Sequence, residues 1–328
     1  MQNKLLHTPE GFRDIYGNEI VRKSNVKHTL ADTIRKYGYL SIETPSVEYF
    51  DVFSKNIGTI PSKELYKFFD KEGNTLCLRP DFTPSIARVA ATYFADANEP
   101  LKFYYSGSTF VNRNDHQGKL KESTQVGAEL MGDASVEADY EIILMMLDCA
   151  DSLSISEFQV TIGNVEYFKG LCEEIDTDTE LSLREMISNK NYFGAKAILD
   201  ATTVSSEKKE IILNITSLFG GEDSINKALE MADNDRSRAA ALRLKALDDL
   251  LKKDGKNIKV TYDFGMLSNY NYYTGIVAKG YTYGSGDAIF KGGRYDNLVK
   301  EFGKDLPAVG FAASVDQIAG VIAHREKN

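Results

Sequence analysis

The chain of 328 residues lacks tryptophan and has only three cysteines, Cys77, Cys149 and Cys172. Three widely spaced cysteines give neither a disulfide framework nor the spacing of a metal site, so we predict a protein of the reducing cytoplasm with no bound metal. No apolar run approaches the roughly 18 residues that cross a bilayer, and residues 1–13 have no apolar secretory core. The sequence therefore predicts neither a disulfide-stapled secreted domain nor a membrane partner.

Positive charge is also in short supply. Lys and Arg number 39 against 48 Asp and Glu, which gives a formal net charge of −9. Because binding of nucleic-acid phosphates needs concentrated Lys and Arg, this balance argues against a large nucleic-acid footprint. Only residues 113–121 are locally basic, and the simplest interpretation of that stretch is a solvated loop.

Aromatic residues and glycines are plentiful in residues 260–283, where the stretch NYYTG (residues 271–275) lies between apolar runs. The β-branched and aromatic content predicts strand–turn–strand. Adjacent tyrosines on a strand point to opposite faces, so we expect one of Tyr272 and Tyr273 to line a pocket and the other to pack behind it. Taken alone, the segment is more typical of core aromatics in a sheet.

The rest of the chain mixes helix and strand patterns. Helices are expected over residues 18–37, 81–94, 136–152, 297–302 and 314–324, and strands over residues 39–42, 65–70, 75–78, 103–110, 124–131, 157–163, 258–264, 288–290 and 309–313. Residues 292–296 (GGRYD) are expected to form a turn before the helix that follows.

Residues 165–253 differ, because they are charged, amphipathic and nearly free of strand patterns. We therefore predict an α+β fold, with a mainly antiparallel sheet flanked by helices. Its core would comprise residues 1–164 and 254–328, and residues 165–253 would form a helical insertion subdomain. Two interpretations of the insertion remain open, a partner surface and a stabilising addition.

One expected strand, residues 124–131, carries polar side chains on a single face. Alternation along the strand puts Gln125 and Glu129 on the same side, about 13 Å apart. Polar groups on a sheet that is otherwise apolar indicate the floor of a pocket. A solvated sheet face is the alternative.

Seven short motifs match one known family in order along the chain. They are residues 8–14, 18–45, 78–83, 125–129, 272–275, 292–296 and 307–311. Together they make the chain resemble the catalytic core of histidyl-tRNA synthetase, a class II aminoacyl-tRNA synthetase. The resemblance covers nearly the whole chain and implies a class II synthetase-like core. It also implies that the anticodon-binding domain of the synthetases is absent.

The departures from the family concern ATP chemistry. Three family arginines that contact ATP or the substrate carboxylate correspond here to Val111, Ser268 and Gln317. Activation of an amino acid requires cations that stabilise charge on the transferring phosphoryl group, and each lost contact costs on the order of 10²–10³ in rate. We therefore expect no adenylation, no catalytic residue and no cofactor.

The amino-acid pocket, in contrast, resembles that of the family. The residues expected to bind histidine are Asp81, Thr83, Gln125, Glu129, Tyr272 and Tyr273. The first three match the family's positions for the ammonium group, although Asp81 stands where the family has a glutamate. Glu129 and Tyr273 match the positions for the imidazole, with Tyr272 beside them.

Several of these motif residues also have purely structural interpretations. Asp81 is a suitable helix N-cap. Arg294 fits a surface turn, and Gly292, Gly293 and Gly310 fit close packing of strands without any ligand.

A chain that keeps an amino-acid pocket and loses ATP chemistry resembles the histidyl-synthetase-like regulatory subunits of ATP phosphoribosyltransferase, the first enzyme of histidine biosynthesis. In that family a short-form catalytic subunit requires this partner for activity, and histidine inhibits the hetero-oligomer. The resemblance implies a homodimer within the assembly and no tRNA partner. Two alternatives are a shortened synthetase-like ligase that activates an amino acid with ATP, and a sensor of uncharged tRNA.

Overall fold

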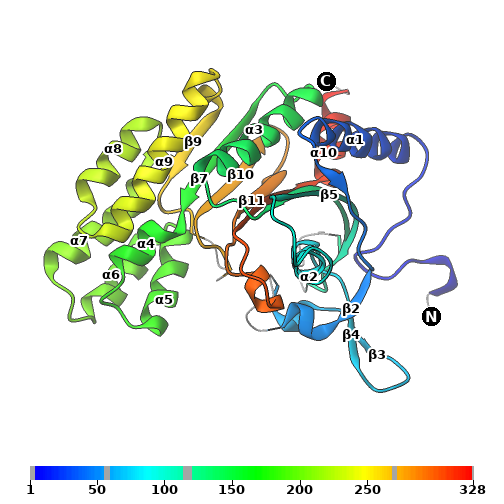
Figure 1. The fold of residues 1–328 in the computed structure, drawn as a ribbon, viewed down its shortest axis with the longest axis horizontal. Coiled ribbons are helices and arrows are strands. Elements are labelled where there is room, and N and C mark those ends of the chain that lie inside the picture. The colour runs from blue at the N-terminus through cyan, green and yellow to red at the C-terminus, as the bar shows by residue number, and fades with distance from the viewer. Residues whose placement is uncertain (1–3, 55–59, 114–119, 268–271, 327–328) are drawn as a thin grey trace.

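The computed structural model describes residues 4–54, 60–113, 120–267 and 272–326, and Figure 1 shows their arrangement. A nine-stranded sheet runs through the molecule in the order β1-β5-β6-β12-β11-β10-β7-β9-β8. Its strands are β1 (Leu40–Ser41), β5 (Leu101–Phe110), β6 (Glu122–Met131), β12 (Ala308–Ser314), β11 (Phe290–Arg294), β10 (Ile276–Thr282), β7 (Phe158–Asn164), β9 (Val260–Asp263) and β8 (Phe219–Gly220). Only the pairs β1–β5 and β7–β9 of this sheet are parallel, so the predicted α+β class with a mainly antiparallel sheet is confirmed.

Helices cover one face of the sheet and leave the other to the functional cleft. They are α1 (Asn18–Arg35), α3 (Val136–Ser152) and α10 (Val315–Arg325), which lie side by side in Figure 1. Val126, Ala128 and Leu130 of β6 point into the hydrophobic core beneath these helices. The alternation predicted for this strand is therefore confirmed, and Gln125 and Glu129 face the opposite side.

On the opposite side lies α2 (Thr83–Tyr93), which packs Phe82 and Ile86 against Phe103 and Tyr105 of β5. A small antiparallel sheet continues from this region, with strands β2 (Val47–Tyr49), β4 (Thr75–Leu78) and β3 (Lys67–Phe69) in the order β2-β4-β3. The predicted hairpin between residues 65–70 and 75–78 is confirmed as β3 and β4.

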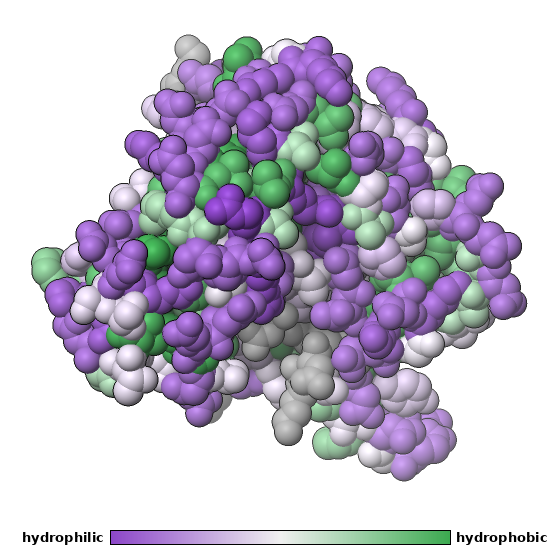
Figure 2. Space-filling view, turned by 60° about the vertical axis from the view of Figure 1, so that its left-hand side comes forward, coloured by the Kyte–Doolittle hydropathy of each residue, from purple (hydrophilic) through white to green (hydrophobic). Residues whose placement is uncertain are grey.

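Residues 165–253 contain six helices beside the β7–β9 end of the sheet (Figure 1). They are α4 (Val165–Leu171), α5 (Thr177–Ser188), α6 (Tyr192–Asp200), α7 (Ser206–Asn214), α8 (Glu222–Met231) and α9 (Asp235–Lys253). Side chains of Asp176, Ser205 and Asn234 accept hydrogen bonds from backbone N–H groups at helix starts, which explains where those helices begin. The face in Figure 2 is mostly hydrophilic, with hydrophobic side chains in separate groups.

The expected strand–turn–strand of residues 260–283 is not a hairpin, because β9 pairs with β7 and β8, whereas β10 pairs with β7 and β11. Tyr272 and Tyr273 lie before β10 rather than within a strand. The expectation that they point to opposite faces is therefore wrong. Their ring centroids are 4.2 Å apart, and both rings line the same cavity.

The glycine motif of residues 292–296 also differs from its prediction. Gly292, Gly293 and Arg294 belong to β11 rather than to a turn. At Gly292 an added Cβ would overlap the carbonyl oxygen of Gly310 on β12, so only glycine allows the two strands to approach this closely. The predicted helix of residues 297–302 is a short 3₁₀ helix, η6 (Val299–Phe302).

Arg294 is not the surface turn residue that the sequence left open, because its side chain is only 3% exposed. Its guanidinium pairs with Asp139 of α3 at 2.7 Å and with Asp296 at 3.0 Å.

Among the described residues, no helix is both long enough and apolar enough to span a bilayer.

Candidate functional site: a cleft above four strands

A cavity of about 1010 Å³ opens above β6, β12, β11 and β10, on the sheet face opposite α1, α3 and α10. It brings together all six residues predicted to bind the amino acid, namely Asp81, Thr83, Gln125, Glu129, Tyr272 and Tyr273. Val111 and Gln317, two of the positions where the family carries arginine, also line it. The third such position, Ser268, lies outside the described residues.

Glu129 is the buried acidic group of this cleft, with 1% of its surface exposed. Its Oε1 accepts a hydrogen bond from the Thr83 hydroxyl at 2.7 Å, and its Oε2 accepts one from the Tyr295 hydroxyl. Burial raises the pKa of Glu129 to about 8, an effect that the two hydrogen bonds oppose and the nearby Asp81 charge reinforces. A carboxyl with this pKa takes up or releases a proton near neutral pH.

Two glycines form the floor between Glu129 and Tyr273. Gly310 lies directly opposite Glu129 on the neighbouring strand, and Gly293 lies opposite Gly310 on the strand after that. A Cβ at Gly310 would overlap Glu129 Oε2, and a Cβ at Gly293 would lie 2.6 Å from Tyr273 Cε1. The carboxyl and the phenol ring therefore lie over neighbouring bare strands. Glycine at these two positions provides the room that the carboxyl and the phenol ring occupy.

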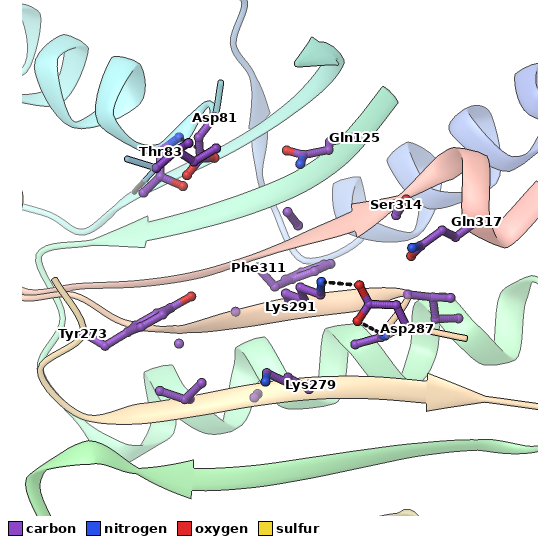
Figure 3. A pocket seen from close by; sticks show the side chains of 18 of the residues that line it. Asp81, Thr83, Gln125, Tyr273, Lys279, Asp287, Lys291, Phe311, Ser314 and Gln317 are labelled. Carbon is purple, nitrogen blue, oxygen red and sulfur yellow. Dashed lines mark hydrogen bonds and ion pairs between the residues drawn. The ribbon is translucent and has the colours of Figure 1, made fainter. Parts of the chain in front are cut away.

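Asp81, Thr83 and Gln125 line the cavity on the side of α2 and β6 (Figure 3). Asp81 Oδ1 accepts hydrogen bonds from the backbone N–H of Phe82 at 2.7 Å and of Thr83 at 3.4 Å, so it both supports the start of α2 and faces the cleft. Gln125 Oε1 is buried and has no hydrogen-bond partner among the described residues. A buried acceptor of this kind is costly unless a donor satisfies it, and a ligand ammonium group is such a donor.

The structure adds Tyr295 to the lining of the cavity, which the sequence did not assign to the site, and the buried Tyr105 belongs to the same hydrophobic cluster as Tyr295. The Tyr105 ring stacks on Phe82 with centroids 4.3 Å apart. Its hydroxyl is buried beside the Thr83 side chain and stands close to where a Cβ of Gly127 would be. Tyr295 was visible in the GGRYD motif, but nothing local in the sequence pairs it with Glu129, 166 residues away.

Gly310→Ala is expected to destabilise the protein by about 1–3 kcal/mol, because the new methyl group displaces the Glu129 carboxyl from its two hydroxyl partners. Urea unfolding monitored by circular dichroism measures the change. Gly320→Ala is the matched control: Gly320 lies in α10 with open space around its Cβ position, so the control should be neutral or slightly stabilising. Equal effects at the two positions would contradict the close packing of Glu129 over β12.

Comparisons with known proteins match this geometry. The sheet, the flanking helices and the cleft define a class II aminoacyl-tRNA-synthetase-like protein, and the family model described as histidyl-tRNA synthetase matches residues 11–318. Within that class, the chain belongs to the family of ATP phosphoribosyltransferase regulatory subunits. The predicted resemblance is thereby confirmed.

Two curated relatives carry the name ATP phosphoribosyltransferase regulatory subunit. The one from Acetivibrio thermocellus is 40% identical over 315 residues, which cover 95% of this chain and 75% of the relative. The one from Ruminiclostridium cellulolyticum is 39% identical over 320 residues, which cover 97% and 76%.

Solved structures agree with these relatives. An ATP phosphoribosyltransferase regulatory subunit/histidyl-tRNA synthetase from Bacillus halodurans has a TM-score of 0.89 and 31% identity, and the match covers 97% of this chain and 83% of that one. A histidine–tRNA ligase subunit from Alicyclobacillus acidocaldarius has a TM-score of 0.83 and 25% identity, with 98% of both chains covered.

Proposed function

We propose that the chain is a non-catalytic regulatory subunit that activates a short-form catalytic subunit of ATP phosphoribosyltransferase and makes the assembly sensitive to inhibition by histidine. One observation carries the proposal. The cleft keeps polar groups suited to an amino acid, whereas Val111 and Gln317 put no charge where the synthetases hold ATP with arginine.

Histidine is the proposed effector because its functional groups match the cleft. Its imidazole fits between Glu129 and Tyr273, above the glycine floor, with an N–H donating to the buried carboxyl. Its ammonium group would lie near Asp81, Thr83 and the unpartnered Gln125 Oε1. Inhibition would then reflect a coupling free energy between this cleft and the catalytic subunit, typically about 1–3 kcal/mol.

The phosphoribosyltransferase rate of a short-form catalytic subunit, with and without this chain and across a histidine titration, tests the proposal. Addition of the chain should activate the enzyme, and histidine should then inhibit it. No effect of the chain would reject the regulatory role. Histidine-dependent ATP–pyrophosphate exchange by the chain alone would instead support the alternative, a synthetase-like ligase, and salt-sensitive tRNA binding would support the sensor of uncharged tRNA.

We further propose that two copies of the chain associate through the first class II motif. Leu40 on the edge strand β1, and Val47 and Tyr49 on β2, are exposed apolar side chains close to this motif. Tyr49→Glu should shift sedimentation at micromolar concentration from dimer toward monomer. Phe193→Glu, at a more exposed aromatic residue on α6, serves as the control and should not change the oligomer. A wild-type monomer under these conditions would contradict the homodimer.

A further inference from the structure

The cationic side chains of the cleft differ in whether their charge is already neutralised. Among the described residues, six cationic side chains line the cavity. Four pair with a carboxylate: Arg13 with Glu19, Arg113 with Glu64, Lys190 with Asp263, and Lys291 with Asp287. Lys121 donates a hydrogen bond to Asn112 Oδ1 at 3.2 Å. Lys279 alone has neither an ion pair nor a hydrogen bond within the described part of the chain.

The strand register relates Lys279 to the amino-acid pocket. Val277 lies opposite Gly293 in the row of residues that crosses the sheet to Gly310 and Glu129. Lys279 follows Val277 by two residues on the same face of β10, about 7 Å further along the strand. Lys279 therefore belongs to the next set of cross-strand neighbours, a second row beside the one that contains Gly293 and Gly310.

Small residues fill the middle of this second row. Lys291 lies directly opposite Lys279, Ala312 lies opposite Lys291, and Gly127 lies opposite Ala312 on β6. Toward the far wall, where Gln125 and Asp81 lie (Figure 3), this row ends at Gly127, and the Tyr105 hydroxyl stands over that glycine. Two lysines directly opposite on antiparallel strands repel each other, and Asp287 forms an ion pair with Lys291. The charges of Asp287 and Asp263 also act on Lys279, but neither forms an ion pair with it. The row thus carries one positive charge that has no ion pair within the described part of the chain and faces the cavity.

The two sides of the cleft are complementary to a zwitterion. Carboxyl groups lie on the side of α2 and β6, at Asp81 and Glu129, and Lys279, which has no ion pair in the described part of the chain, lies across from them on β10. An α-amino acid with its side chain over the glycines and its ammonium group at Asp81 and Gln125 directs its carboxylate toward β11 and β10. Burial lowers the pKa of Lys279, the charge of Lys291 adds to this effect, and the charges of Asp287 and Asp263 oppose it in part. A bound carboxylate would also oppose it.

We propose that Lys279 binds the carboxylate of the amino-acid effector and so takes over the charge that the synthetases supply with arginine at the position of Ser268. The inference rests on the proposed function, because it assigns one contact within the proposed histidine site. It makes Lys279 a specificity residue, since its charge distinguishes an amino acid from an amine or alcohol with the same imidazole.

Calorimetric titration of the full chain with L-histidine and with L-histidinol tests the assignment. L-Histidinol keeps the imidazole and the amine but carries an alcohol in place of the carboxylate. The wild-type chain should bind L-histidine more tightly, and Lys279→Met should reduce that preference by roughly tenfold to a hundredfold. L-Histidinol affinity should change little, which also shows that the variant is folded. Lys279→Arg should retain part of the preference.

Lys190→Met and Lys291→Met are the matched controls, because both lysines line the same cavity but already pair with a carboxylate. Neither should reduce the preference for L-histidine as Lys279→Met does. If the wild-type chain binds L-histidine and the Lys279→Met variant keeps the full preference for L-histidine over L-histidinol, this inference is overturned and the proposed function is left intact. A wild-type chain that binds neither compound rejects the proposed histidine site itself, and the inference with it.

Discussion

Arg294→Met should lower the free energy of unfolding by about 3–5 kcal/mol, because it leaves a buried carboxylate without its main partner. Asp139 is fully buried, and Arg294 contacts it through both Nε, at 2.8 Å, and Nη2, at 2.7 Å. The same guanidinium donates to the backbone carbonyl groups of Asp133 and Ser135. The substitution therefore removes a charge and several hydrogen bonds at the junction of α3 with β11.

Arg243→Met provides the matched comparison, since Arg243 Nε contacts the same Asp139 carboxylate at 2.6 Å from the partly exposed side. Water can replace that guanidinium, so we expect a smaller loss of about 1–2 kcal/mol. Urea unfolding of both variants at pH 7 measures the difference. Similar losses for the two arginines would show that burial of Arg294 does not govern the stability of this ion pair.

The position of Arg294 in a strand could not be predicted from the sequence. Glycines beside a charged residue predict a turn when only neighbours along the chain are considered. The structure puts this stretch in a strand, because Gly292 allows close approach to β12. The decisive partner, Asp139, lies 155 residues earlier in the sequence. No local pattern contains that information.

Other features followed correctly from local rules. Alternation along residues 124–131 put Gln125 and Glu129 on one face, and both line the cavity. The rule failed for Tyr272 and Tyr273 because it holds only within a strand, and these residues precede β10. The prediction of an amino-acid site came from the family resemblance, whereas Tyr295 and Lys279 emerged only from cross-strand contacts and register. Register is set by long-range pairing, which a single sequence does not specify.

Above pH 8, where Glu129 is ionised, Glu129→Gln should weaken histidine binding by roughly a hundredfold, because the imidazole N–H loses a charged acceptor worth up to about 3 kcal/mol. The amide nearly preserves the shape of the side chain. The Thr83 and Tyr295 hydroxyls each donate to one carboxylate oxygen of Glu129, and the NH₂ group that replaces one of these oxygens cannot accept its hydrogen bond. Calorimetric titration with L-histidine measures the loss. Glu122→Gln, at the exposed first residue of β6, is the matched control for loss of a carboxylate on the same strand. Equal affinities of Glu129→Gln and the wild type would remove Glu129 from the proposed histidine site.

The same variant should change how stability depends on pH. The pKa of Glu129 rises from 4.5 to about 8 on folding, so the folded chain binds a proton there that the unfolded chain releases. The stability contributed by this proton is fully present below pH 4.5 and is lost as the pH rises through about 8, by about 1.4 kcal/mol per pH unit in between. Glu129→Gln lacks this proton and should gain stability relative to the wild type at that rate between about pH 5 and 8, with no further gain above. Urea unfolding across this range, without histidine, measures the difference. Parallel profiles for the two proteins would mean that Glu129 is already ionised in the empty cleft, and that its two hydroxyl partners outweigh the cost of burial.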